Sequence, residues 1–213
     1  MVRVWMPDRP GALGQVASRI GAVGGDVVGI DILERGAGRA IDELVVQLPE
    51  ADLLPLLLRE ISDVDGVDVE DVRPASESLR DPRLAALETA AMLVGAMSVD
   101  ELLDVLVEHA EHDFVAEWVA VVDLEEPEVR ASTGLVPSVG WLCAFVEGSR
   151  SSAVAADAEV TWAPLPSARL SLVIGRSGRP LRARERRQVA ALARIADTRW
   201  LEVCRLRHPS AAR

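Results

Sequence analysis

The sequence predicts an α+β protein built from two domains. Its 213 residues are more than one small domain needs and are enough for two. Hydrophobic residues make up 49% and charged residues 27% of the chain, which are ordinary values for proteins with buried cores. Short runs that alternate between apolar and polar residues are interleaved with segments of helical apolar spacing, so strands and helices are both expected.

The first 74 residues predict a strand, a helix, two strands, a helix and a strand. The expected elements are a strand at 2–6, a helix from Ala12 to the glycine pair Gly24-Gly25, strands at 27–33 and 40–48 around a hairpin turn at 36–38, a helix opened by residues 49–52, and a strand at 67–72. The second helix carries its apolar face on Leu53, Leu56, Leu57 and Ile61. This β-α-β-β-α-β order is the split βαβ, or ferredoxin-like, arrangement.

A polar, proline-containing stretch follows, and we predict a linker at 75–81, a second domain at 82–207 and a tail at 208–213. The expected elements are a helix capped by Asp81-Pro82 and carrying Leu84, Leu87, Ala91 and Val94, a helix from Ser98 to Glu111, strands at 118–122 and 128–132, a short helix at 139–146, strands at 159–165 and 169–175, and a long helix from Arg182. Apolar residues at 189, 192, 196, 200 and 203 mark the buried stripe of the last helix.

The most informative motif is the turn between the first strand and the first helix. It runs through Asp8, Arg9, Pro10, Gly11, Ala12 and Leu13. Gly11 lets the backbone approach a ligand without interference from a Cβ atom. The first N–H groups of the helix lie at this turn, and the positive end of the helix dipole favours a carboxylate there. Asp8 stands beside them and can hold an ammonium group, so the local chemistry suits a zwitterionic amino acid.

This motif, the glycine-rich end of the helix before Asp26 and the element order together resemble the ACT domain family. The resemblance covers about a third of the chain. It implies a regulatory domain that binds a small effector, usually an amino acid, at a loop facing a dimer partner. By this resemblance Asp8, Arg9, Pro10, Gly11, Ala12, Leu13 and Asp26 would line the ligand. Asp8 and Asp26 stand where many amino-acid-binding members carry asparagine, and some ACT-like domains serve only for dimerisation.

The second domain resembles a short GAF-type sensor domain, with an antiparallel sheet and a long closing helix around residues 181–193. Such domains bind small molecules in a pocket over the sheet. The sequence identifies no nucleotide motif there and no chromophore attachment at Cys143. Trp141 and Trp162 could line a cavity, although a place in the core is the simpler expectation for both.

Charge and apolar content exclude several classes of function. The net charge of −11 argues against general nucleic-acid binding. Arg182, Arg184, Arg186 and Arg187 form a local basic exception, expected either on a solvated helix face with carboxylate partners or in contact with an acidic partner. No apolar run is long enough for a membrane helix, so we expect a cytoplasmic protein. Cys143 and Cys204 are expected to be reduced and buried.

No catalytic motif, cofactor or metal site is predicted. His109 and His112 have a spacing that can bind one metal ion, but no third ligand is near in sequence, so cationic side chains at a helix end are the preferred interpretation. Residues 149–152 are expected to be a surface loop rather than an anion site.

The sequence therefore predicts a non-catalytic, homodimeric regulatory protein that senses a small molecule, most simply an amino acid. The alternative is a ligand-free dimerisation and interaction module that docks a protein, or DNA, through its basic last helix. An enzyme with an unrecognised site in residues 80–205 is the third possibility.

Overall fold

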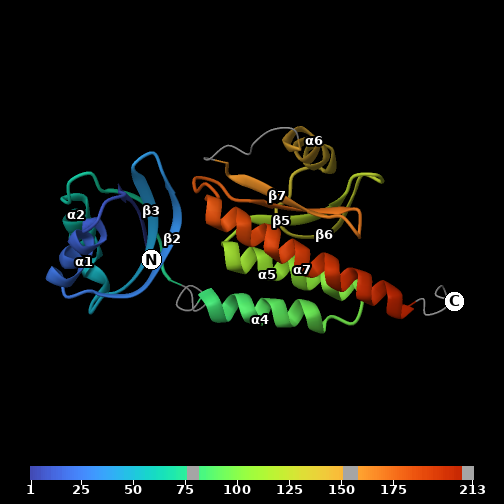
Figure 1. The fold of residues 1–213 in the computed structure, drawn as a ribbon, viewed down its shortest axis with the longest axis horizontal. Coiled ribbons are helices and arrows are strands. Elements are labelled where there is room, and N and C mark those ends of the chain that lie inside the picture. Colours follow the sequence, from blue (N-terminus) through green and yellow to red (C-terminus); the bar gives the residue numbers. More distant parts are fainter. Residues whose placement is uncertain (76–81, 151–157, 208–213) are drawn as a thin grey trace. The chain divides into compact units, whose positions relative to one another are not determined.

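The computed structural model describes residues 1–75, 82–150 and 158–207. Contacts within the chain divide it into an N-terminal unit, Met1–Pro82, and a C-terminal unit, Arg83–Arg213. Each unit has its own four-stranded antiparallel sheet with helices packed on it (Figure 1). The predicted α+β class is confirmed. Residues 76–81 of the expected linker, with the Asp81 cap, as well as Ser151-Ser152 and the tail, lie outside the described residues.

The N-terminal unit follows the predicted order of elements. It contains β1 (Val2–Pro7), α1 (Ala12–Ala22), β2 (Asp26–Gly36), β3 (Arg39–Gln47), the 3-10 helix η1 (Ala51–Leu53), α2 (Leu54–Ser62) and β4 (Asp68–Val72). The sheet order is β2-β3-β1-β4, and both helices cover the same face of it (Figure 1). The hairpin between β2 and β3 turns at Ala37 and Gly38, which both have positive φ, as a tight two-residue turn requires.

The core of the N-terminal unit lies between the sheet and its two helices. Alternate residues of β1, namely Val2, Val4 and Met6, are buried against α1 and α2. Leu57 and Ile61 of α2 are buried as predicted, but Leu56 is 37% exposed. The helix presents the face through 57 and 61, spaced i and i+4, to the sheet, and this spacing turns Leu56 toward solvent.

The C-terminal unit also contains all the predicted elements that fall within the described residues. They are α4 (Pro82–Gly95), α5 (Val99–Phe114), β5 (Trp118–Asp123), β6 (Glu128–Gly134), α6 (Val139–Ser149), β7 (Val160–Leu165), β8 (Leu170–Gly175) and α7 (Ala183–Arg207). The sheet order is β6-β5-β8-β7. α5 and α7 cover one face and α6 covers the other (Figure 1). Among the described helices none is both long and apolar enough to cross a bilayer.

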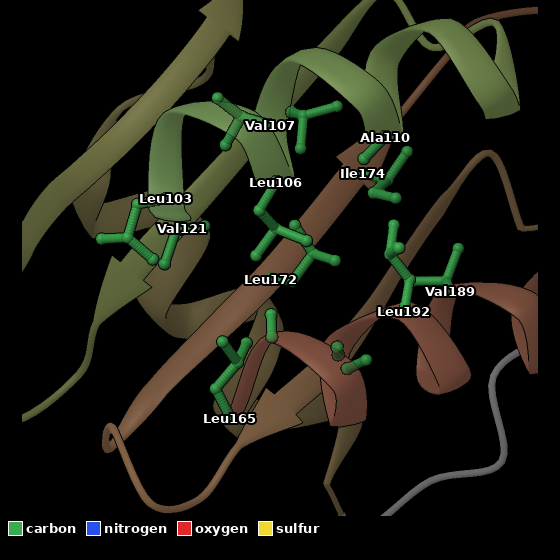
Figure 2. Close-up of a cluster of buried hydrophobic side chains, with 14 of the residues drawn as sticks. Leu103, Leu106, Val107, Ala110, Val121, Leu165, Leu172, Ile174, Val189 and Leu192 are labelled. Carbon is green, nitrogen blue, oxygen red and sulfur yellow. The ribbon is translucent and has the colours of Figure 1, made fainter. Parts of the chain in front are cut away.

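The main core of this unit lies between the sheet and the pair of helices α5 and α7. Figure 2 shows Leu106 of α5, Leu172 of β8 and Leu192 of α7 pointing toward one another. Each fully buried leucine stabilises the fold by about 1.5–3 kcal/mol relative to exposure. The start of α5 is fixed as its capping sequence predicts. The Ser98 hydroxyl accepts the Glu101 N–H at 3.1 Å, and the Glu101 carboxylate accepts the Met97 N–H at 2.7 Å.

Helix α4 uses a different face from the one that its apolar spacing indicates. Leu84, Leu87, Ala91 and Val94 are exposed, whereas Thr89, Leu93 and the following Ala96 are buried. The helix is apolar around most of its circumference, so its periodicity cannot select the face that packs against the unit.

The close approach of Trp118 to Gly175 gives a test of the C-terminal sheet. A Cβ atom at Gly175 would lie 2.1 Å from the Trp118 ring. We expect Gly175→Ala to destabilise this unit by about 1–3 kcal/mol, because the indole must be displaced from a packed position. Gly140→Ala in α6 is the matched control, since a Cβ there meets nothing within 4 Å. Urea denaturation monitored by tryptophan fluorescence measures both, and equal midpoints for the two variants would refute the packing argument.

Candidate functional site

The predicted binding turn lies at the end of β1, beside the β2–β3 hairpin. β1 ends at Pro7, opposite Arg39 of β3. The Asp8 N–H donates to the Gly38 carbonyl at 2.9 Å, and the Arg9 N–H donates to the Pro7 carbonyl at 2.9 Å. The first of these bonds ties the turn to the β2–β3 hairpin, and the second closes a tight turn within the chain.

Helix α1 begins at this turn without a side-chain cap. Gly11 is the N-cap residue, with φ of 87°, and no side chain accepts a hydrogen bond from the first turn. A Cβ atom at Gly11 would meet nothing within 4 Å, so the left-handed backbone, not crowding, favours glycine here. The first N–H groups of a helix have no partners within it, and together they carry the positive end of the dipole. The Ala12 N–H already donates to the Arg9 carbonyl at 3.2 Å, so an anionic group at the start of α1 would bind the N–H groups that follow it.

The register of the sheet adds two charged side chains to this turn. Arg35 of β2 lies opposite Ala40, and Asp42 of β3 lies opposite Val4. Because Val4 belongs to the core under the helices, Asp42 lies on the face of the sheet that α1 and α2 cover. The Nε atom of Arg35 is 3.9 Å from Oδ1 of Asp8. We call residues 8–13 together with Arg35 and Asp42 the loop site.

Asp42 is the unusual member of the loop site. It is only 4% exposed, and its Oδ1 atom has no hydrogen-bond partner among the described residues. Burial raises the pKa of the Asp42 carboxyl above its ordinary value; the charge of Arg35 lowers it, and those of Asp8 and Asp31 raise it. A buried carboxylate with a free lone pair is an acceptor suited to a cationic group such as an ammonium.

Only some of the predicted site residues have side chains that are exposed at the start of α1. Asp8, Arg9, Pro10 and Gly11 are exposed around the start of α1, and the Arg9 guanidinium donates to the Gln15 side chain at 3.2 Å. The side chains of Ala12 and Leu13 belong to the core and its edge, so these residues can offer a ligand only their backbone.

Asp26 lies at the other end of the sheet from the turn. It pairs with Gln47, whereas the turn adjoins Arg39, and the eight residue steps of β3 between them span about 26 Å. One chain does not bring Asp26 to the loop site, so Asp26 can reach such a site only from a second copy.

Sequence reasoning missed Arg35 and Asp42. A signal for Asp42 exists in the sequence, because it interrupts the apolar stretch from Ala40 to Val46. Its position on the core face follows only from the β1–β3 register. No local sequence pattern marks Arg35 as a site residue, because its proximity to Asp8 depends on the pairing of β2 with β3.

A cavity of about 690 Å³ lies at the opposite end of the N-terminal unit. Its walls are mostly apolar and come from the end of β3, from η1 and α2, and from the residues around the end of β4. Arg73 is the charged side chain in its lining, and the Nη2 atom of Arg73 already donates to Oε1 of Glu43 at 3.2 Å. The Nε and Nη1 atoms of Arg73 are buried without a hydrogen-bond partner among the described residues, so the cavity offers a ligand one cationic side chain among apolar walls, whereas the loop site offers charged side chains of both signs and a helix start.

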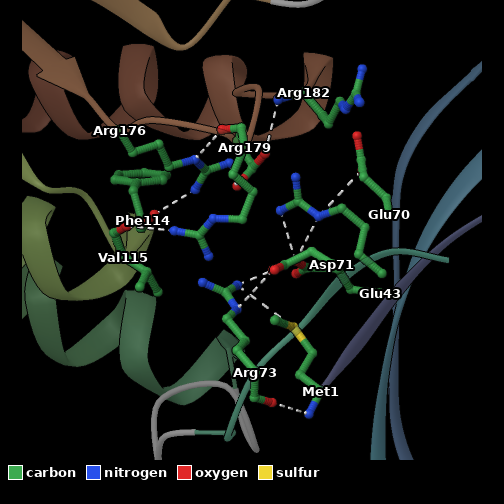
Figure 3. Close-up of polar contacts among 12 residues, drawn as sticks. Met1, Glu43, Glu70, Asp71, Arg73, Phe114, Val115, Arg176, Arg179 and Arg182 are labelled. Carbon is green, nitrogen blue, oxygen red and sulfur yellow. Dashed lines mark hydrogen bonds and ion pairs between the residues drawn. The ribbon is translucent and has the colours of Figure 1, made fainter. Parts of the chain in front are cut away.

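A buried ion cluster links β1 and β3 on the face of the sheet away from the helices (Figure 3). The Nε and Nη2 atoms of Arg3 donate to Oε1 of Glu43 at 2.9 and 2.7 Å, and Arg73 donates to the same oxygen. Arg3 is fully buried. We interpret this cluster as structural, because its carboxylate is already shared between two arginines.

One histidine of the predicted pair, His109, belongs to a polar contact between two helices of the C-terminal unit. Thr89 of α4 lies 3.2 Å from Nδ1 of His109, and its hydroxyl donates to Asp113 at 2.8 Å, so this group joins α4 to α5. Burial raises the pKa of the Asp113 carboxyl, and the Thr89 hydrogen bond lowers it. Within the described ranges, no three side chains are grouped in a way that could hold a metal ion.

The aromatic and cysteine residues near α6 differ in part from the predictions. Trp141 is 44% exposed, stacked on Phe145 at a ring distance of 5.3 Å, so its predicted place in the core is wrong. Trp162 is partly buried and packs against the edge of a core cluster, rather than lying inside the core as predicted. Cys143 and Cys204 are free thiols, but both are half-buried rather than buried. Burial raises the pKa of the Cys143 thiol, and the charges of Glu147 and Asp123 raise it further, which disfavours the reactive thiolate.

The basic start of α7 is not simply a solvated face. Arg182 is buried, and its N–H donates to Oε2 of Glu185 at 2.8 Å. Oε1 of Glu185 accepts from Nη2 of Arg176 at 2.6 Å, and Arg176 also donates to the Phe114 carbonyl at 2.5 Å (Figure 3). Glu185 thus supplies a carboxylate partner within the unit and fixes the first turn of the helix.

Comparison with known proteins does not assign the chain to a family. No protein-family model matches the chain, and no curated protein is similar to it at a significant level. The resemblance of the two units to ACT and GAF domains remains a prediction that rests on the motif and on the order of elements.

The buried carboxyl of Asp42 predicts a specific dependence of stability on pH. An acid whose pKa is raised by folding contributes stability below its ordinary value, here 3.8, and loses it as the pH rises through the folded pKa. We expect Asp42→Asn to be more stable than the wild type at pH 7, by about 1 kcal/mol. The advantage should shrink as the pH falls through the folded pKa of Asp42 toward 3.8, and it should be lost below that pH. Urea denaturation across this pH range measures it, with Asp52→Asn in the exposed η1 helix as the control. An Asp42→Asn variant that is less stable than the wild type at pH 7 would contradict the argument.

Proposed function

We propose that the N-terminal unit is a regulatory module that binds a small zwitterion, an amino acid, at the loop site. One observation carries the proposal: the start of α1 has no side-chain cap, and the core face of the same sheet carries a buried aspartate, Asp42, with an unbonded oxygen, opposite Val4 near the end of β1. Both features cost stability in the ligand-free protein, and both are compensated when a ligand supplies the missing charges.

The two ends of an amino acid match two parts of the loop site. Its carboxylate binds the N–H groups at the start of α1, where the dipole favours a negative charge, with Arg35 adding a cation. Its ammonium group binds Asp8 and Asp42. Because Asp42 is largely removed from water, its ion pair with the ligand is screened little by solvent. Asp26, if it takes part, acts from a second copy of the chain.

A regulatory role requires that binding change the rest of the chain. The turn is tied to the β2–β3 hairpin through the Asp8 N–H and to the core through Ala12. A ligand at the loop site therefore contacts a turn that is connected to both the hairpin and the core of the unit. The ligand acts as an effector only if it binds one state of the protein more tightly than another.

Docking of a partner through the basic start of α7 has less support. Arg182 is buried, and the Arg186 side chain donates to the Leu181 carbonyl within the same unit. Two of the four arginines that suggested an acidic partner are thus engaged by the fold itself.

Isothermal titration calorimetry of the full chain against the twenty amino acids tests the proposal. We expect at least one to bind, and Asp42→Asn to weaken its binding by about tenfold or more, since a charge-assisted hydrogen bond contributes about 1.5–3 kcal/mol. Asp52→Asn, at the other end of the unit, should bind like the wild type. Absence of binding across the whole panel, or equal affinity in the Asp42 and Asp52 variants, would overturn the assignment.

A further inference from the structure

Helix α4 carries a continuous apolar stripe on its outer face. Leu84, Leu87 and Val94 are 51%, 69% and 55% exposed, and Ala91 between them is also exposed. Five of the large exposed apolar residues in the described part of the chain fall on this helix and just after it: Leu84, Leu87, Met92, Val94 and Met97. Isolated exposed apolar side chains are ordinary, but a stripe along one helix marks a contact surface.

The spacing of the stripe identifies the kind of contact. Its four residues are three, four and three positions apart, which is the a-d-a-d pattern of a coiled-coil seam. The opposite face, through Thr89 and Leu93, is buried in the C-terminal unit. The helix is therefore anchored on one side and presents a heptad seam on the other.

We propose that a second copy of this chain covers the stripe, with the two α4 helices packed in parallel about a twofold axis. Such a seam is self-complementary, because a heptad stripe meets an identical stripe with each a and d residue opposite its counterpart. The proposal is independent of the ligand proposed for the loop site.

The charges that flank the stripe determine the orientation. Arg83 and Glu88 are exposed and occupy the g and e positions of consecutive heptads. In a parallel pair, each g residue faces the e residue five positions later in the other helix, so Arg83 lies opposite Glu88 of the second copy on both sides of the seam. In an antiparallel pair, e positions face each other, which brings the two Glu88 side chains together at the centre. Opposite charges thus favour the parallel arrangement.

Helix α7 extends the surface beside the stripe. A groove of about 350 Å³ runs between α4 and α7, with Val94, Ile195 and Thr198 among its lining residues. The stripe from Leu84 to Val94 is only about 17 Å long, so two α4 helices alone would bury less than a stable dimer needs. Side chains of the second copy that enter this groove add the contribution of α7.

Sedimentation of the full chain with a substitution in the stripe tests the interface. We expect the wild type to be a dimer and Leu87→Glu to raise the dimer dissociation constant at least a hundredfold, because it places two carboxylates in the seam. Leu87 is exposed, so the variant should keep the wild-type circular dichroism spectrum. Leu135→Glu is the matched control, since Leu135 is 94% exposed in the loop after β6 and should leave the dimer unchanged. A monomeric wild type, or a Leu87→Glu variant that remains dimeric, would overturn the proposal.

Cysteine crosslinking tests the orientation separately. In a Cys143→Ser, Cys204→Ser background, Leu87→Cys should form a disulfide-linked dimer under mild oxidation, since residue 87 meets residue 87 only in a parallel seam. Ala86→Cys, exposed but off the stripe, should not crosslink. Arg83→Glu should weaken the dimer, and Arg83→Glu combined with Glu88→Arg should restore it. Failure of Leu87→Cys to crosslink while the dimer persists would exclude the parallel seam.

Discussion

The pairing of Arg3 with Glu43 across β1 and β3 is the interaction on which the candidate site depends. A shift of one residue between these strands would leave a fully buried arginine without its carboxylate, and breaking a buried pair in this way costs about 3–5 kcal/mol. The same register places Asp42 opposite Val4, on the face under the helices. It also carries the β2–β3 hairpin to the turn where Arg35 approaches Asp8. The position of the loop site is thus a consequence of an ion pair on the other face of the sheet.

The loop site departs from the rules that govern the rest of the N-terminal unit. Elsewhere the core face carries aliphatic residues, and the buried charges of the other face lie within ion-pair distance of an opposite charge, although some of their polar atoms also have no hydrogen bond. At the loop site a carboxylate is buried with an unbonded oxygen, and a helix begins without a cap. Local departures of this kind are typical of binding sites, because the groups that a ligand satisfies are unsatisfied before it binds. This contrast favours the loop site over the apolar cavity at the far end of the unit.

In the C-terminal unit, the feature that the fold leaves uncovered is one apolar side of helix α4. Its sheet is covered on both faces, by α5 and α7 on one side and by α6 on the other, and these layers form two closed cores. Helix α4 contributes only Leu93 to the main core, joined by the following Ala96, and is held further by the Thr89 group. An apolar helix that the fold uses on one side only leaves its other side available for association. If both proposals hold, the chain has a place for an effector in one unit and a means of dimerisation in the other.

Local signals in the sequence determined the elements and their order. The alternation in β1, the glycines around α1, the Ser98 cap and the spacing in α7 each depend on a few neighbouring residues, and the structure contains each element. Tertiary structure decided which faces are buried and which residues meet. Leu84 and Leu87 have the spacing of a core face, yet they are exposed, because α4 is apolar on several sides and only its neighbours select one. Asp42 lies opposite Val4, toward the end of β1 that leads into the turn, and Asp26 lies at the other end of the sheet, because strand pairing joins residues that are distant in sequence. Such pairings depend on the whole sheet, and no local pattern encodes them.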